Sequence, residues 1–463
     1  MLTTFSRHIV YPLMNLRDPF KRLSVTRQME RDQWASPDDL EARQRQRLRS
    51  LLHYCARHVP YYRQLFDSVG FNPERVNLPE DLAKLPILTK EQIRDSGAAL
   101  LSDEFSLGDL VEARTGGSTG VALTIYADRA CQAARNAAGM RSDGWAGWKP
   151  GTRIAAAWGN PPSFTTLRPW LRNTLYNRLL FLDTMRMSDE SMRAFFAECN
   201  RESAYVLYGH AHSLYLYAAF LREQGLRPNR PAGIIATSMM LLDPERRIIE
   251  SVFGIPVSNR YGCEEVGLIA SECERHQGLH LNTDHVFVEL LDDDGQPVAD
   301  GTEGNVAVTD LINRGQPLIR YLLGDRAVRA RQACGCGRGL PLLERVTGRT
   351  ADFLVRTDGS RVAGISMIER TLTLVEGIKQ LQIVQMAVEE FVLRVVPDAA
   401  YSPDSEAQLR AEFADTFGPG TRVDIEFTDG IERAASGKYR FSICRVPPPV
   451  AERAAAAPQS LGA

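Results

Sequence analysis

Short apolar runs alternate with longer segments of helical pattern through the middle of the chain. The runs have the length and composition of strands buried on both faces, and the segments between them repeat apolar residues at three- and four-residue spacing. Strands are expected at residues 153–158, 203–208, 233–236 and 257–259, and helices at 213–224 and 244–253. This alternation predicts a largely parallel sheet covered by helices on both faces.

Different patterns flank this region. Residues 38–55 are rich in Leu, Arg, Gln and Glu, which predicts a helix whose pattern ends near Pro60. The N-terminal segment is therefore expected to be all-helical. Residues 286–291 and 304–309 have the pattern of strands on either side of an Asp- and Gly-rich turn. They predict an antiparallel pair within a β-rich subdomain.

The pattern changes again after Asp352. Helix, strand, strand, helix and strand are expected in turn at residues 366–375, 380–388, 391–396, 405–417 and 423–427. The proline- and alanine-rich tail has little to bury and is expected to be disordered. The predicted fold is therefore α/β, with a large domain over 1–350, a small α+β domain over 351–446, and the tail 447–463.

Length and charge limit the classes of function. A chain of 463 residues with 44% hydrophobic residues is too long for one ordinary core, so two or more globular domains are expected. The 55 basic and 57 acidic residues nearly cancel, to a net charge of −2. This balance argues against a nucleic-acid partner.

The first twenty residues carry six apolar side chains at helical spacing. They lack the compact apolar stretch of a secretory signal, and the chain has no run of about 18 apolar residues, so a cytoplasmic protein without a transmembrane segment is expected. The six side chains suit either a membrane surface or packing on the body of the protein, and packing is favoured. They are Phe5, Ile9, Val10, Leu13, Met14 and Leu16.

The segment Thr115-Gly116-Gly117-Ser118-Thr119-Gly120 lies between two strand-like runs. Its three glycines would let the backbone approach phosphate oxygens, and its hydroxyls would add donors. It is not a Walker loop, because no lysine follows Gly120. Taken alone, it suits a hairpin turn as well as a nucleotide-binding loop.

Further motifs follow in a fixed order along the chain. They are Leu85-Pro86-Ile87-Leu88-Thr89-Lys90 before the glycine-rich segment, and after it Tyr261-Gly262-Cys263-Glu264-Glu265, Ile319-Arg320-Tyr321-Leu322-Leu323-Gly324-Asp325, Thr347-Gly348-Arg349 and Ser436-Gly437-Lys438. In this order the set resembles the phenylacetate-coenzyme A ligase branch of the adenylate-forming superfamily, including homologues from capsule polysaccharide gene clusters. The resemblance extends from about Val59 to Lys438.

The resemblance implies a site for ATP. Tyr261 would offer its ring face to adenine, with Gly262 leaving room for the stack. Asp325 is an acceptor-only carboxylate suited to the two ribose hydroxyls, and Arg349 would support the same sugar. Each of these residues also has an ordinary structural explanation, as a core or turn residue, so the assignment depends on the whole set.

It also implies groups that act on the phosphates. Residues 115–120 would hold the β- and γ-phosphates. Thr119, within this segment, would also be one of the catalytic residues. Glu265 would hold Mg²⁺, a hard cation that prefers carboxylate oxygen. Lys438 would neutralise charge that develops between the substrate carboxylate and the α-phosphate. The small C-terminal domain is expected to be mobile and to rotate between formation of the acyl-adenylate and transfer of the acyl group.

Two positions depart from the family pattern. Ala351 stands where the branch carries the first of two acidic residues at the domain hinge, and Asp352 follows it. Met239 and Met240 stand where an acidic residue is usual. Methionine is apolar and adaptable, so a different pocket lining is expected there.

Four residues suggest a zinc site. Cys334 and Cys336 form a close thiol pair, and Cys273 with His280 would complete a tetrahedral set of three thiolates and an imidazole. Relatives with the Cys-x-Cys pair resemble this chain at the other two positions as well. Bound zinc is favoured over free thiols, and His276 is an alternative to His280 as the fourth ligand. A site closed by four protein ligands would stabilise the fold.

The acid pocket is expected beyond the carboxyl ends of the parallel strands. Trp158, Asn160, Tyr208 and Ser238 are the predicted pocket residues, although each could serve only in packing.

The expected function is ATP-dependent activation of an aryl or fatty carboxylic acid, followed by transfer to coenzyme A. A carrier-protein thiol, an amine or a sugar remains an alternative acceptor, and a non-catalytic scaffold derived from such a ligase is a further alternative. The identity of the acid and the oligomeric state stay open.

Overall fold

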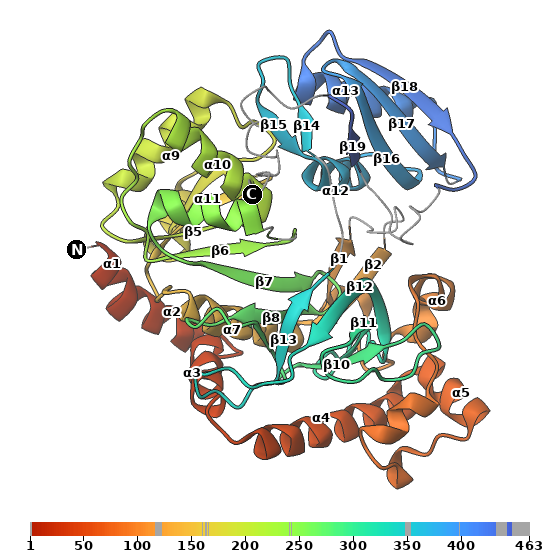
Figure 1. The fold of residues 1–463 in the computed structure, drawn as a ribbon. Helices are drawn as coiled ribbons and strands as arrows, with labels where there is room; N and C mark the ends of the chain where they lie inside the picture. Colours follow the sequence, from red (N-terminus) through yellow and green to blue (C-terminus); the bar gives the residue numbers. More distant parts are fainter. Residues whose placement is uncertain are drawn as a thin grey trace, which may run out of the picture. The chain divides into compact units, whose positions relative to one another are not determined.

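The computed structural model describes residues 2–115, 123–159, 161–162, 164, 166–239, 241, 243–347, 353–397, 399–431 and 442–446. The chain forms two compact units (Figure 1). The first comprises residues 1–118, 122–184 and 189–350, and the second comprises 119–121, 185–188 and 351–463. Each unit has a hydrophobic core of its own.

The first unit is built on an eleven-stranded sheet, and five neighbouring strands of this sheet run parallel in the order β4-β3-β5-β6-β7. The prediction of parallel strands alternating with helices is confirmed, although the second expected strand is displaced by two residues and β4 was not predicted. The strands are β3 (Arg153–Trp158), β4 (Leu179–Asp183), β5 (Tyr205–His210), β6 (Gly233–Thr237) and β7 (Val257–Cys263).

The other six strands extend the same sheet in antiparallel fashion, in the order β10-β11-β12-β13-β9-β8 up to β7. The change occurs within β7, because residues 257–259 pair with β6 and residues 260–263 pair with β8. The expected antiparallel pair is β10 with β11, and these strands continue the main sheet. The strands are β8 (Gly267–Glu272), β9 (Leu279–Leu281), β10 (Val286–Leu291), β11 (Glu303–Asp310), β12 (Tyr321–Arg329) and β13 (Leu342–Val346).

Eleven α-helices in the described part of this unit surround the sheet. The expected helix at 38–55 is α4, which Ser36 caps by accepting a hydrogen bond from the Asp39 amide at 3.1 Å. Val59 is extended before Pro60, which opens the next helix. The helices are α1 (Leu2–Phe5), α2 (Tyr11–Arg17), α3 (Arg22–Asp32), α4 (Pro37–His58), α5 (Pro60–Val69), α6 (Lys90–Ser96), α7 (Arg129–Trp145), α8 (Leu167–Arg172), α9 (Asp189–Arg201), α10 (Ala211–Glu223) and α11 (Asp243–Phe253).

The first helix differs from the sequence expectation. α1, the π-helical turn η1 (Ser6–Val10) and α2 follow one another without a break in helical backbone. Ser6 and Tyr11 are buried, and Val10 and Met14 are half-buried. Four of the six apolar side chains that were expected to pack on the body are instead exposed, namely Phe5, Ile9, Leu13 and Leu16. Helical spacing alone could not tell which of two adjacent stripes faces the core.

The second unit contains a four-stranded sheet in the order β18-β17-β16-β19. The predicted sequence of helix, strand, strand, helix and strand is observed, and Phe391, Phe413 and Phe417 pack together in the core. β14, β15 and β19 were not predicted because each has only three residues. The elements are β14 (Phe353–Val355), β15 (Arg361–Ala363), α12 (Gly364–Leu374), β16 (Ile378–Ala387), β17 (Glu390–Pro397), α13 (Pro403–Phe417), β18 (Arg422–Phe427) and β19 (Ser442–Cys444).

None of the helices described in either unit is long and apolar enough to cross a membrane.

Candidate functional site

Three of the residues predicted to bind the nucleotide, Tyr261, Gly262 and Asp325, line a cavity of about 280 Å³ in the first unit. Tyr261 and Gly262 reach it from β7, Asp325 reaches it from β12, and Ser238 reaches it from the turn after β6. Ser238 was expected in the acid pocket, but the structure places it here, with a left-handed backbone (φ 63°) that is uncommon for a residue other than glycine.

Tyr261 and Asp325 contact each other directly. The Tyr261 hydroxyl donates a hydrogen bond to Asp325 Oδ2 at 2.9 Å, and Asp325 is 5% exposed. Three strands, β8, β9 and β13, separate β7 from β12 in the sheet, so the contact depends on the curvature of the sheet. A carboxylate held in this way keeps further acceptor positions for hydroxyl donors of a ligand.

Gly262 has a second structural role. A Cβ at this position would lie 2.7 Å from the carbonyl oxygen of Gly267 on the neighbouring strand β8. The pairing of β7 with β8 also shifts register between Tyr261 and Gly262. The small residue therefore permits the close approach of two strands beside the cavity.

Glu265 lies buried in a group of polar side chains that sequence reasoning missed. Its Oε1 accepts a hydrogen bond from the Tyr321 hydroxyl at 2.9 Å and lies 3.6 Å from Lys90 Nζ. Arg135 from α7 donates to the Glu265 backbone carbonyl at 2.7 Å. Lys90 and Tyr321 both lie inside the quoted motifs, so the motifs contained the signal, whereas nothing in the sequence pattern marked Arg135.

A second cavity, of about 320 Å³, lies along the parallel strands and is mainly apolar and aromatic. The predicted pocket residues Trp158, at the end of β3, and Tyr208, on β5, both line it. Their rings stack with centroids 5.5 Å apart. The other lining residues are the apolar Trp148, Ile154, Ala156, Leu179, Phe181, Val206 and Ile235 and the charged Asp143 and Arg260.

His210 adjoins the aromatic pair, with its ring centroid 4.1 Å from that of Trp158. Burial lowers the pKa of His210 to about 4, so its imidazole is neutral near pH 7. Burial also raises the pKa of the Tyr208 phenol. Both side chains therefore present uncharged rings beside this cavity.

Arg260 lines both cavities and connects them. Its guanidinium lies 2.5 Å from Asp143 Oδ1 and 5.8 Å above the centre of the Tyr208 ring. Burial favours the neutral guanidine, but Asp143 and Tyr208 together outweigh this effect and raise the pKa of Arg260. The ion pair of Arg260 with Asp143 thus lies between the two cavities.

Several predicted residues lie outside the described residues. They are Gly116, Gly117, Ser118, Thr119, Gly120, Asn160, Met240, Arg349, Ala351, Asp352 and Lys438. Thr115 ends β1 (Leu110–Thr115), which pairs antiparallel with β2 (Leu123–Asp128) through Thr115 opposite Leu123. The glycine-rich segment therefore connects two paired strands, as its sequence position predicted.

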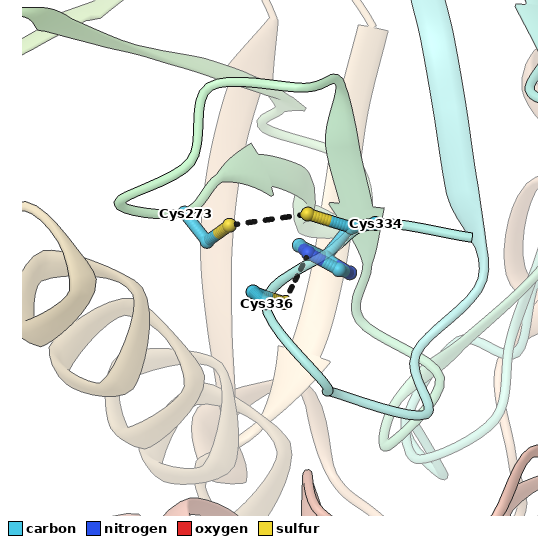
Figure 2. A group of neighbouring side chains, drawn as sticks. Cys273, Cys334 and Cys336 are labelled. Atoms are coloured by element: carbon cyan, nitrogen blue, oxygen red, sulfur yellow. Dashed lines mark hydrogen bonds between the residues drawn. The ribbon is translucent and has the colours of Figure 1, made fainter. Parts of the chain in front are cut away.

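The four predicted zinc ligands lie together, with their ligand atoms all within 4.8 Å of one another. The Cys273 and Cys334 sulfurs are 3.7 Å apart, and the Cys336 sulfur is 3.4 Å from His280 Nε2 (Figure 2). His276 instead contacts the Glu272 carboxylate at 3.2 Å, which resolves the alternative between the two histidines.

Neighbouring groups orient the imidazole of His280 and shift the pKa values of the thiols in this cluster. His280 Nδ1 lies 3.2 Å from the Leu340 carbonyl, which fixes the proton on Nδ1 and leaves Nε2 to face the sulfurs. Burial alone would raise the pKa of the Cys336 thiol, but the backbone N–H of Arg338 and the neighbouring groups lower it. Burial raises the pKa of the Cys273 and Cys334 thiols. The thiolate is the form that binds metal. The donor set therefore fits tetrahedral Zn²⁺.

Comparison with known proteins identifies relatives of this chain. Residues 354–445 match the family model of the CapK C-terminal domain. The chain is 25% identical over 415 residues to a phenylacetate-coenzyme A ligase of Thermus thermophilus, and the aligned region covers 82% of this chain and 83% of that protein. It is 27% identical over 345 residues to a phenylacetate-coenzyme A ligase of Escherichia coli, and this aligned region covers 69% of this chain and 74% of that protein.

The fold is also that of solved ligases. The structure of 2-hydroxyisobutyryl-CoA ligase with 2-HIB-AMP and CoA in the thioesterification state matches with a TM-score of 0.59 and 21% identity, covering 90% of this chain and 92% of that one. An open conformation of the same ligase matches with a TM-score of 0.55 and 22% identity, covering 86% and 90%. This chain is therefore a relative of the phenylacetate-coenzyme A ligases, with the fold of the adenylate-forming superfamily.

Proposed function

We propose that this protein uses ATP to convert an organic carboxylic acid to an acyl-adenylate and then transfers the acyl group to the thiol of coenzyme A. AMP and pyrophosphate are the other products. The observation that carries the proposal is the pair of adjoining cavities, one with Tyr261 and Asp325 and one mainly aromatic, which share Arg260. The names of the curated relatives and the acyl-adenylate bound in the structural neighbour support the same chemistry.

The nucleotide would occupy the first cavity. Tyr261 would contact adenine, and Asp325 would accept hydrogen bonds from the ribose hydroxyls, with Arg349 supporting the sugar. Residues 115–120 would hold the phosphates that leave as pyrophosphate, Thr119 among them. Positioning and electrostatic compensation would account for most of the rate acceleration in such a reaction.

Mg²⁺ bound with ATP would neutralise phosphate charge. Glu265 fits this role, because its carboxylate is a hard oxygen donor and Tyr321 and Lys90 hold it in place. Lys438 would stabilise negative charge at the α-phosphate while the carboxylate attacks. No side-chain nucleophile is needed, because the substrate carboxylate itself forms the new bond to phosphorus.

The acid would occupy the second cavity. Its volume of about 320 Å³ is at the lower end for small-molecule sites, which favours a single aromatic ring or a short chain. The stacked rings of Trp158 and Tyr208 offer an apolar surface to such a group. Arg260 would attract the carboxylate to the boundary with the nucleotide cavity, next to the α-phosphate.

Acid-dependent exchange of labelled pyrophosphate into ATP tests this proposal. The purified full chain should catalyse exchange with some members of a carboxylate panel, aromatic acids first, and should form a coenzyme A thioester that mass spectrometry detects. Exchange without thioester would favour an amine, a sugar or a carrier-protein thiol as acceptor. Absence of ATP binding in calorimetry would contradict the proposal and favour the non-catalytic scaffold.

We further propose that Cys273, His280, Cys334 and Cys336 hold a structural Zn²⁺. Cys273 follows β8, His280 lies on β9 and the cysteine pair lies between β12 and β13, so the metal would connect three parts of the sheet. Four protein ligands leave no open position for water, and the ion would therefore stabilise the fold without taking part in the reaction.

Cys336→Ser is expected to lose bound zinc and to lower the melting temperature by roughly 5 °C or more, because metal binding contributes directly to folding free energy. Metal content by mass spectrometry and thermal melting give the two readouts. Cys444→Ser is the matched control, since Cys444 is also half-buried but lies outside the cluster. A zinc-free wild-type protein that melts together with Cys336→Ser would show that the thiols are free.

A further inference from the structure

The helix formed by α1, η1 and α2 exposes a continuous apolar stripe. Leu2, Phe5, Ile9, Leu13 and Leu16 follow one another at intervals of three or four residues. Leu13 is 55% exposed and Leu16 is 70% exposed. This spacing places the five side chains along one side of the helix.

The helix is nevertheless held firmly on the body of the first unit. Ser6 Oγ donates to the Leu175 carbonyl at 2.6 Å, and the Tyr11 hydroxyl donates to the Tyr176 carbonyl at 3.2 Å. Ser6 and Tyr11 are buried. Because these contacts fix the rotation of the helix, the apolar stripe faces outward as part of the folded structure.

The neighbouring helix exposes apolar residues as well. α8 continues into the π-helical turn η6 (Asn173–Asn177), which is the segment that Ser6 and Tyr11 contact. Within α8, Leu167 is 71% exposed and Trp170 is 51% exposed, and Leu171 is exposed beside them. We call the exposed side chains of these two helices the apolar face. Tryptophan and leucine are common in helices that lie in a membrane interface.

Charge around the apolar face differs from charge in the rest of the chain. Residues 2–22 and 166–178 contain seven Lys or Arg residues and a single acidic residue, Asp18, whereas the whole chain has a net charge of −2. Asp18 is itself paired with Arg22 at 2.7 Å. The remaining basic residues are Arg7, Arg17, Lys21, Arg168, Arg172 and the buried Arg178.

This charge decides which partner suits the apolar face. A second copy would bring a cationic face against an identical cationic face, and the two would repel each other. The headgroups of an anionic bilayer attract Lys and Arg, while the boundary below them accepts Leu, Phe and Trp side chains.

We propose that the apolar face docks on the surface of an anionic phospholipid bilayer, with the α1–α2 helix and α8 lying in the plane of the interface. The protein binds this surface peripherally. The inference stands apart from the proposed ligase activity, because none of its residues lines either cavity. The two regions are close, however, since the Tyr11 ring packs 6.2 Å from that of Trp148 in the wall of the apolar cavity.

Flotation with lipid vesicles tests the proposal. Vesicles of phosphatidylcholine with about 30 mol% phosphatidylglycerol should bind the full chain at least about tenfold more tightly than vesicles of phosphatidylcholine alone, and added salt should weaken the binding. Leu13→Ser with Leu16→Ser should reduce binding about tenfold or more, because two inserted side chains are lost. Arg168→Gln with Arg172→Gln should reduce binding to the anionic vesicles only.

Leu107→Ser is the matched control, since Leu107 is 60% exposed and lies outside the apolar face. This variant should bind vesicles like the wild type, and thermal melting should show that all variants fold. Absence of wild-type binding would overturn the proposal, as would equal binding by Leu13→Ser/Leu16→Ser. A dimer that this double variant dissociates, found together with absence of vesicle binding, would assign the apolar face to a second copy.

Discussion

Glu265→Gln is expected to lower acid-dependent ATP–pyrophosphate exchange by about 100- to 1000-fold, the range typical for loss of one preorganised electrostatic group. The buried carboxylate is held by Tyr321 at 2.9 Å and Lys90 at 3.6 Å, so its position is set before any ligand binds. Glutamine keeps an acceptor for Tyr321 but removes the charge that would hold Mg²⁺. Exchange at saturating ATP and acid measures the loss.

Loss of stability must be separated from loss of chemistry. Removing the charge opposite Lys90, which is 5% exposed, is expected to cost about 3 kcal/mol of unfolding free energy. Lys90→Met added to Glu265→Gln should restore much of this stability, because no charge then faces a neutral side chain, while exchange should stay low. Recovery of exchange in the double variant would show that the carboxylate is not needed.

Glu264→Gln is the control for the neighbouring position. The Glu264 side chain is exposed, whereas that of Glu265 is buried. We expect exchange by Glu264→Gln to remain within about threefold of the wild type, because substitutions at exposed positions usually have small effects.

Asp325→Asn is expected to lower kcat/KM for ATP by about 100-fold. Two hydrogen bonds from ribose hydroxyls to a carboxylate contribute about 1.5 kcal/mol each, and a loss of about 3 kcal/mol corresponds to roughly a hundredfold. Because the proposed contact is with the nucleotide, the KM for the acid should change little. Steady-state exchange at varied ATP and at varied acid separates the two effects.

Tyr261→Phe provides the comparison. It removes the 2.9 Å hydrogen bond to Asp325 but keeps the ring that would contact adenine. The expected loss in kcat/KM for ATP is about tenfold or less, since one hydrogen bond to a charged group is involved. A larger loss for Tyr261→Phe than for Asp325→Asn would contradict the assignment of Asp325 to the ribose.

Much of the fold could be predicted from the sequence. Four of the five parallel strands, the antiparallel pair of β10 and β11 and the order of elements in the second unit followed from hydrophobic period, because burial of one or both faces leaves a regular pattern in each element. The parallel strand β4 was not predicted. Strands as short as β14 or β19 leave no such pattern. The pattern also did not show that β7 carries both parallel and antiparallel partners.

The site was predictable only in part. Tyr261 and Asp325 line one cavity and Trp158 and Tyr208 line the other, while Ser238, expected with the second pair, lies with the first. The bridging position of Arg260 could not be anticipated, since it depends on a contact with Asp143 more than 100 residues away in the chain.

The sequence by itself determined the ordered motifs, the types of element that carry them and the set of possible zinc ligands. Only the tertiary structure decided that His280, and not His276, faces the three cysteines. It likewise decided that Lys90 and Tyr321 meet Glu265, and that Leu13 and Leu16 face outward. The physical reason is the same in each case: a period along the chain reports how one element is buried, whereas charge pairing, ligand geometry and the outward face of a helix depend on elements distant in sequence.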